Sequence, residues 1–263
     1  MVFIDTHTHL DCEEFDADRS VTLERARLAG VRRMLVMGIT QEHWGRLWRL
    51  TTSESGLFAA FGLHPVYLEQ HRPSHLEQLH DLLAEHRADP RLCAIGEIGL
   101  DYFIAKLDRQ RQQYYLEAQL ELARDFDLPV LLHVRRAHAD MIAILKRFRL
   151  PRAGIVHAFA GSHEEAREYI RLGFRLGLGG APTWPQAKRL HRVVAALPAE
   201  SIVLETDAPD MAPSFHAYQR NTPELLPRIC EHLASLRGES SETLAQRSLH
   251  NTCELFGWQP ESV

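Results

Sequence analysis

The chain has 263 residues, of which 45% are hydrophobic and 25% charged, and its formal net charge is −5. This length suits one large domain or two small ones, and the composition is that of an ordinary globular protein. No apolar run approaches the length of a membrane span, and the negative charge argues against a nucleic-acid-binding surface that covers the whole chain.

The start of the chain and its cysteines indicate a compartment. Residues 1–5 lack the basic region and cleavage site of a signal peptide, so we expect none. The four cysteines form no Cys-x-x-Cys pair, which favours reduced thiols. We therefore expect a cytoplasmic protein with no membrane partner.

Short apolar runs alternate with longer amphipathic stretches from one end of the chain to the other. The apolar runs predict strands at residues 2–4, 34–38, 58–62, 92–96, 129–132, 154–156, 174–180 and 202–204. The stretches between them predict helices at residues 20–30, 42–53, 75–86, 110–126, 137–148, 163–172 and 188–197, with two further helical patterns within 222–256.

Eight strand-then-helix units in about 260 residues match the size of a parallel (β/α)8 barrel. The strands are almost continuously apolar, as a sheet buried on both faces requires. No Gly/Ser-rich linker or charge run divides the chain. We therefore predict an α/β fold, a single TIM-barrel domain over residues 1–263 with extra C-terminal helices.

Two histidines close the first strand, in the stretch Asp5-Thr6-His7-Thr8-His9. Side chains alternate along a strand, so His7 and His9 are expected to point the same way. Neutral imidazole is a common ligand of zinc and its neighbours. A lone His-x-His more often lies in an ordinary loop, so the metal interpretation depends on similar residues elsewhere.

Such residues recur where other predicted strands end. The set is His7, His9, Glu97, His133, His157 and Asp207. In a barrel these strand ends converge on one mouth, where the active sites of this fold lie. Four histidines and two carboxylates suit two divalent ions with one bridging carboxylate.

Four other residues have weaker claims. His64 is expected to contact a substrate phosphate or a further ion, or merely to cap its turn, and Glu205 to bind a third ion or to position a ligand histidine. Arg135 is expected to face the same side as His133 and to clamp a phosphate, whereas Arg136 should face away; if the strand ends earlier, the two exchange roles. The plain alternative is that the two arginines are a solvated, salt-bridging pair. Loop aromatics that could stack on a base, or simply pack, are Tyr102, Phe103 and Trp184.

The order and spacing of these motifs resemble those of the TatD-type metal-dependent deoxyribonucleases, within the amidohydrolase-like barrels and nearest their YjjV-like branch. The matching motifs are FIDTHTHL at 3–10, GLHP at 62–65, GEIGLDY at 96–102, LPVLLHVR at 128–135, HAFAG at 157–161, ETDAP at 205–209, RNTP at 220–223 and NTCELF at 251–256. The resemblance covers essentially the whole chain. It implies a hydrolase that cleaves phosphodiester bonds of DNA, including exonuclease action on single strands or 3′ ends.

The resulting hypothesis is two-metal hydrolysis. One ion would be held by His7, His9 and Asp207, and the second by His133 and His157, with Glu97 bridging them. Asp207 would orient the attacking water and accept its proton, while Arg135 would help to stabilise charge on the phosphoryl oxygens. Imidazole and carboxylate ligands together do not distinguish Zn, Mn and Mg.

Two other kinds of protein remain open. One is a small-molecule hydrolase acting on lactones, amides or phosphate esters. Many related barrel enzymes of that kind bridge their metals with a modified lysine. The lysines here are Lys106, Lys146 and Lys188, and none ends a predicted strand. The other is a non-catalytic metal- or nucleic-acid-binding protein that keeps the barrel, which the complete set of six ligands disfavours.

Overall fold

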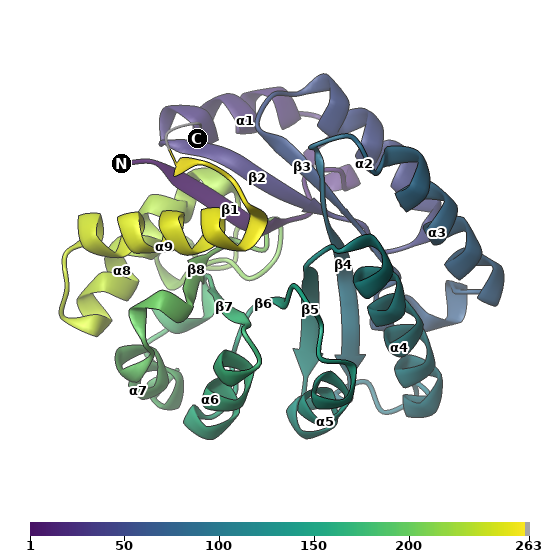
Figure 1. Ribbon diagram of the computed structural model, residues 1–263. Helices are drawn as coiled ribbons and strands as arrows, with labels where there is room; N and C mark the ends of the chain where they lie inside the picture. The colour runs from purple at the N-terminus through teal and green to yellow at the C-terminus, as the bar shows by residue number, and fades with distance from the viewer. Residues whose placement is uncertain (261–263) are drawn as a thin grey trace. The chain divides into compact units, whose positions relative to one another are not determined.

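The computed structural model describes residues 1–260, in which strands and helices alternate along the chain (Figure 1). The strands are β1 (Phe3–Thr8), β2 (Val31–Met37), β3 (Leu57–Phe61), β4 (Leu92–Asp101), β5 (Val130–Arg135), β6 (Gly154–Val156), β7 (Arg175–Leu178) and β8 (Ile202–Leu204). They form one eight-stranded sheet in the order β1-β2-β3-β4-β5-β6-β7-β8. This order, with helices between the strands, is that of a (β/α)8 TIM barrel, so the predicted fold class is confirmed.

The helices follow the strands as the amphipathic stretches predicted. They are α1 (Arg19–Leu28), α2 (Gln41–Ser53), α3 (Pro73–His86), α4 (Arg109–Phe126), α5 (His138–Phe148), α6 (His163–Arg171), α7 (Lys188–Ala196), α8 (Leu226–Arg237) and α9 (Ser241–Phe256). Short 3-10 helices lie at η1 (Glu13–Phe15), η2 (Pro65–Gln70), η3 (Ala181–Thr183), η4 (Ala199–Ser201), η5 (Ser214–His216) and η6 (Pro223–Leu225). The two C-terminal helices are thus confirmed. Among residues 1–260, none of the helices is both long and apolar enough to span a bilayer.

Three strands extend beyond the predicted apolar runs at their C-terminal ends. β1, β4 and β5 continue through His7, Glu97 and His133, which were expected to follow their strands. The reason is that backbone pairing continues past the apolar residues, with Gly99 opposite His133 and Asp101 opposite Arg135. His7, Glu97 and His133 therefore lie within the sheet, whereas His9, His157 and Asp207 follow the ends of β1, β6 and β8.

Two compact units, each made of several chain segments, divide the described residues. The first contains residues 1–35, 158–167 and 175 onward, and the second contains residues 36–157 and 168–174. The prediction of a single domain over residues 1–263 stays a prediction.

In the second unit, two buried amides of α4 hold two strand ends. Gln119 accepts a hydrogen bond from the Leu63 amide (2.7 Å) and donates one to the Leu63 carbonyl (3.3 Å). Gln112 does the same for Asp101, at 2.7 and 2.9 Å. The two glutamines are two helical turns apart and so share one face of α4. This face fixes the backbone beside His64 and at the end of β4.

In the first unit, α9 anchors β8 through polar side chains. The side-chain amide of Asn251 donates to the carbonyls of Ala199 and Ile202, at 2.8 and 2.7 Å. The hydroxyl of Ser248 accepts a hydrogen bond from the Leu204 amide at 3.0 Å. These contacts satisfy buried backbone groups at a short strand and so define where β8 ends.

Candidate metal centre

The first unit brings three candidate ligands together. The Oδ1 atom of Asp207 lies 3.7 Å from Nε2 of His7 and 3.5 Å from Nε2 of His9. The ligand atoms of all three lie within 4.8 Å of one another, which suits a single cation. His7, in β1, and His9, just after it, thus point the same way, as strand alternation predicted. We call these three residues the N-terminal cluster.

Backbone and side-chain hydrogen bonds hold the N-terminal cluster. The amide of Asp207 donates to the carbonyl of His7 at 2.9 Å. Asp5 is completely buried and accepts hydrogen bonds from the Thr206 amide (2.9 Å), the Thr206 hydroxyl (2.5 Å) and the His7 amide (3.3 Å). Burial raises the pKa of Asp5 to about 8, although these hydrogen bonds favour the carboxylate. Asp5 therefore ties the ligand strand to the loop that carries Asp207.

The second unit places Glu97 among three imidazoles. Its Oε1 atom lies 3.1 Å from Nδ1 of His133, 3.2 Å from Nε2 of His64 and 3.9 Å from Nε2 of His157. Glu97 is 2% exposed, so its charge has little access to solvent. The ligand atoms of His64, Glu97 and His133 lie within 4.8 Å of one another. We call Glu97, His133 and His157 the central cluster.

Asp101 orients His133 and was missed by the sequence analysis. Its Oδ2 atom lies 3.0 Å from Nε2 of His133. Burial lowers the pKa of His133, but the hydrogen bonds to Asp101 and Glu97 outweigh burial and raise that pKa above its usual value. For Asp101, burial raises the pKa, but the hydrogen bond and charge of His133 with the loop amides outweigh it, so the pKa is lowered. Such a carboxylate–histidine pair fixes the tautomer of a metal ligand.

A simple signal would have identified both supporting carboxylates. Asp5 lies two residues before His7, and Asp101 lies four residues after Glu97. Even spacing along a strand places side chains on the same face. Applying the same test to every acidic residue of the ligand strands would therefore have found them.

His64 caps its turn, which was one of its expected roles. Its Nδ1 atom accepts a hydrogen bond from the Val66 amide at 3.1 Å, at the start of η2. In the neutral imidazole the proton is then on Nε2, which faces Glu97. The cap is confirmed, whereas contact with an ion or a phosphate stays a prediction.

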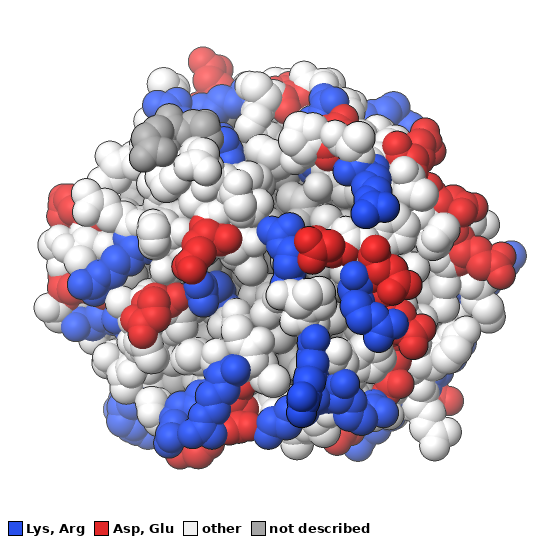
Figure 2. All heavy atoms as spheres, viewed as in Figure 1, with Lys and Arg blue, Asp and Glu red and all other residues white. Residues whose placement is uncertain are grey.

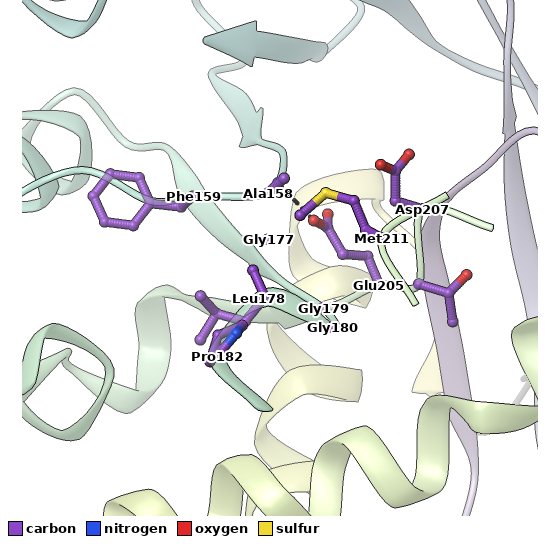
Figure 3. A pocket seen from close by; sticks show the side chains of 12 residues that line it. Ala158, Phe159, Gly177, Leu178, Gly179, Gly180, Pro182, Glu205, Asp207 and Met211 are labelled. Atoms are coloured by element: carbon purple, nitrogen blue, oxygen red, sulfur yellow. Dashed lines mark hydrogen bonds between the residues drawn. The ribbon is translucent and has the colours of Figure 1, made fainter. Parts of the chain in front are cut away.

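Glu205 lies beside a small cavity in the first unit (Figure 3). Its Oε1 atom accepts a hydrogen bond from the Ala158 amide at 2.6 Å, drawn as the dashed line. The cavity of about 10 Å³, roughly one water molecule, is lined by residues that include Gly177, Asp207 and Met211. Gly177 leaves room for the carboxylate, because a Cβ there would lie 2.1 Å from Glu205 Oε2. Glu205 thus positions backbone here, and binding of a third ion stays a prediction.

Arg135, the last residue of β5, and Arg136, which follows it, do not face opposite ways. The guanidinium carbon of Arg135 lies 3.8 Å from the centre of the Phe103 ring, and that of Arg136 lies 4.8 Å from it. The expectation that Arg136 points away is therefore wrong. Arg136 has a φ of 55°, which ends the alternation of the strand.

The face drawn in Figure 2 is neither mainly acidic nor mainly basic. Acidic and basic side chains are interspersed there. This pattern agrees with the expectation from net charge that no basic surface covers the whole chain. Any recognition of an anionic substrate must then be local.

The donor chemistry of both clusters fits divalent cations. Imidazole nitrogens and carboxylate oxygens are the donors that Zn and Mn accept readily, and carboxylates also suit Mg. Three such atoms lie within 4.8 Å of one another in the N-terminal cluster, and three more do so in the group of His64, Glu97 and His133. Buried carboxylates without a cation are costly. Bridging by Glu97 and the assignment of individual ligands stay predictions.

Comparisons with known proteins identify the family of this chain. The model of the "TatD related DNase" family matches residues 4–257. The chain is 43% identical over 254 residues to the uncharacterized metal-dependent hydrolase YjjV of Escherichia coli K12, with 97% of each chain covered. It is 35% identical over 263 residues to the 3′-5′ ssDNA/RNA exonuclease TatD of Klebsiella pneumoniae, covering 96% of this chain and 97% of that protein.

A solved structure extends the similarity to the fold. The crystal structure of YjjV, a TatD homologue from Escherichia coli K12, superposes with a TM-score of 0.94 at 43% identity, covering 98% of each chain. A match of this length includes every element that carries a candidate ligand. The chain therefore belongs to the TatD family of metal-dependent hydrolases.

Proposed function

We propose that this protein is a divalent-metal-dependent nuclease that hydrolyses phosphodiester bonds of DNA, acting on single strands from their 3′ ends. The observation that carries the proposal is the pair of imidazole–carboxylate clusters, one around Asp207 and one around Glu97. The relatives named as 3′-5′ ssDNA/RNA exonucleases support nucleic acid as the substrate class. A cytoplasmic location belongs to the same proposal and is supported by four free cysteines.

The metal would be held by the residues of the two clusters. His7, His9 and Asp207 would hold one divalent ion, and Glu97, His133 and His157 a second, with Glu97 also proposed as the bridging ligand. A third ion would need Glu205 or His64. When bound, such ions acidify water and offset the charge of a phosphodiester.

The protein's own residues would supply orientation and proton transfer. Asp207 is fixed by the hydrogen bond of its amide to His7, so its carboxylate is proposed to orient the attacking water and to accept its proton. Asp101 keeps the Nε2 proton of His133 in place, which leaves Nδ1 directed at Glu97. The buried carboxylate of Glu97 would keep the central cluster anionic and able to retain cations.

The test is a turnover assay with a choice of substrates. Single-stranded DNA labelled at its 3′ or 5′ end is incubated with Mg, Mn or Zn, beside a panel of lactones and phosphate esters. We expect metal-dependent shortening from the 3′ end that a chelator abolishes. Turnover of a small ester without DNA cleavage would instead identify a small-molecule hydrolase, and no turnover at all would favour a non-catalytic protein.

A further inference from the structure

Two neighbouring arginines share one exposed aromatic ring. Phe103 is 46% exposed, and Arg135 and Arg136 are both exposed. Their guanidinium carbons lie 3.8 and 4.8 Å from the centre of the Phe103 ring. Within residues 1–260, neither arginine has a carboxylate at ion-pair distance. Two positive charges are therefore held together without a compensating anion. We call Phe103, Arg135 and Arg136 the arginine pair site.

The geometry of the contact leaves the hydrogen-bonding groups available. A guanidinium that lies over a ring uses its planar face, and its five N–H donors point outward from the edge. The negative face of the ring partly offsets the repulsion between the two cations. Paired guanidinium edges are suited to phosphate oxygens, which accept two parallel hydrogen bonds.

A buried carboxylate connects this site to the central cluster. Asp101 Oδ1 accepts hydrogen bonds from the amides of Phe103 (2.9 Å) and Ile104 (3.2 Å), while its Oδ2 faces Nε2 of His133 at 3.0 Å. The Tyr102 amide donates to the carbonyl of Arg135 at 2.8 Å, which joins the two loops. The position of the arginine pair site is thus fixed relative to a candidate metal ligand.

The site lies beyond the central cluster and not within it. Arg135 is two residues past His133, about 7 Å along a strand, and its guanidinium rests on Phe103. A further positive charge lies nearby at the start of α4, since the guanidinium carbon of Arg109 lies 4.3 Å from the centre of the Tyr102 ring. The carboxylate of Asp140 is engaged by the Tyr102 hydroxyl at 2.8 Å.

We propose that the arginine pair site binds a phosphate of a single-stranded nucleic acid next to the phosphodiester that is cleaved. This inference rests on the proposed nuclease function and specifies how that function selects its substrate. A strand with a neighbouring phosphate would engage the two guanidinium edges, whereas a dinucleotide has no such group to offer. The site would therefore favour oligonucleotides over shorter substrates.

The experiment compares two substrates in the metal-loaded enzyme. They are a fluorescein-labelled thymidine decamer and a thymidine dinucleotide with a single phosphodiester. For Arg135→Ala and Arg136→Ala, we expect the rise in KM to be about tenfold larger for the decamer than for the dinucleotide. Phe103→Leu should weaken decamer binding partially, and Phe103→Tyr, which keeps the ring, should restore it.

A binding measurement gives a second readout that does not depend on turnover. Fluorescence anisotropy of the decamer at several salt concentrations gives the slope of log K against log salt. Each arginine removed should reduce this slope by about 0.7. The matched control is Arg87→Ala, because Arg87 is also exposed and faces a phenylalanine ring, that of Phe126 at 6.0 Å, but precedes β4. This control should change neither KM nor the slope.

The outcomes separate the inference from the proposed function. If the enzyme cleaves the decamer and the arginine variants keep its KM and salt slope, the arginine pair site is wrong and the nuclease function stands. An equal rise in KM for both substrates would place the arginines on the cleaved phosphate and also overturn the inference. If the enzyme cleaves neither substrate, the nuclease function fails, and the salt slope alone decides whether this site binds phosphate.

Discussion

Nε2 of His133 lies 3.0 Å from Oδ2 of Asp101, a carboxylate with no exposed surface. The other ring nitrogen of His133 lies 3.1 Å from Oε1 of Glu97. Each ring nitrogen of His133 therefore has one carboxylate partner, and the two carboxylates differ in their other contacts. Asp101 also accepts hydrogen bonds from two loop amides, so its oxygens are already occupied by protein donors. Glu97 instead faces three imidazoles. A cation at His133 would consequently bind through Nδ1.

Asp101→Asn should lower the affinity for divalent ions while leaving the protein folded. The side-chain amide of asparagine is uncharged, so it lacks the negative charge that fixes the tautomer of His133. Loss of such a partner typically costs roughly 10–100-fold in metal affinity. Isothermal titration with Zn or Mn measures the change. Asp108→Asn is the control, because Asp108 only caps α4 and asparagine also caps helices. Unchanged affinity in Asp101→Asn would show that His133 is not a ligand.

The purified protein should hold at least two divalent ions per chain at saturation. Six ligands in two clusters exceed the four that a single tetrahedral site uses. Elemental analysis after removal of excess metal gives the number. His9→Ala should lower it by removing one donor of the N-terminal cluster, whereas the exposed His250→Ala should not. One ion per chain in the unmodified protein would refute the two-metal hypothesis.

Glu97→Gln should reduce turnover by more than about a hundredfold, since even an outer partner of a ligand is worth roughly 10–100-fold. The substitution keeps the shape of the side chain but removes the charge that three imidazoles surround. Turnover and bound metal are measured together, with the exposed Glu85→Gln as the control. Full activity in Glu97→Gln would mean that hydrolysis occurs elsewhere.

Gly177→Ala should destabilise the protein by roughly 1–3 kcal/mol, the usual cost of overpacking a filled site. The added methyl group would lie 2.1 Å from Oε2 and 2.6 Å from Cδ of Glu205, which is itself buried. Urea unfolding of the metal-free protein measures the effect. The matched control is Gly45→Ala, which should stabilise the protein, because alanine favours a helix more than glycine does. Gly45 is exposed in α2, and a Cβ there would meet only the end of Arg49 at 3.4 Å.

Stability should fall with decreasing pH because of His71. Burial lowers the pKa of His71 below its usual value of 6.5, so the unfolded chain binds more protons than the folded one. The free energy of unfolding therefore decreases as the pH drops through and below about 6.5. His71→Gln can still donate to the His64 carbonyl, which lies 2.8 Å from His71 Nε2, but does not titrate. Urea titrations at several pH values should show a shallower slope for this variant; an identical slope would contradict the assignment.

The sequence was sufficient to predict the fold and to single out candidate ligands that the structure brings together, because both depend on local patterns. Apolar runs mark the strands, and even spacing indicates that His7 and His9 point the same way. Side-chain contacts between segments that are distant in the sequence could not be predicted from it. Spacing marks Asp101 as lying on the same face of β4 as Glu97, but its contact with His133 follows from the register of β4 on β5, which cannot be derived from a single sequence. The placement of Arg136 depends on one left-handed residue after a strand, where alternation no longer applies.

Helix α4 also determines how the central cluster can move. Its two glutamines each form two hydrogen bonds to the backbone, one pair at Leu63, next to His64, and the other at Asp101, the partner of His133. Each of these backbone positions can shift only when its own glutamine is released, and detachment of this face of α4 releases both. Transient local unfolding of α4 would thus loosen His64, which follows β3, and His133, which lies in β5, at the same time. Amide exchange at Leu63 and Asp101 would then report the same opening event.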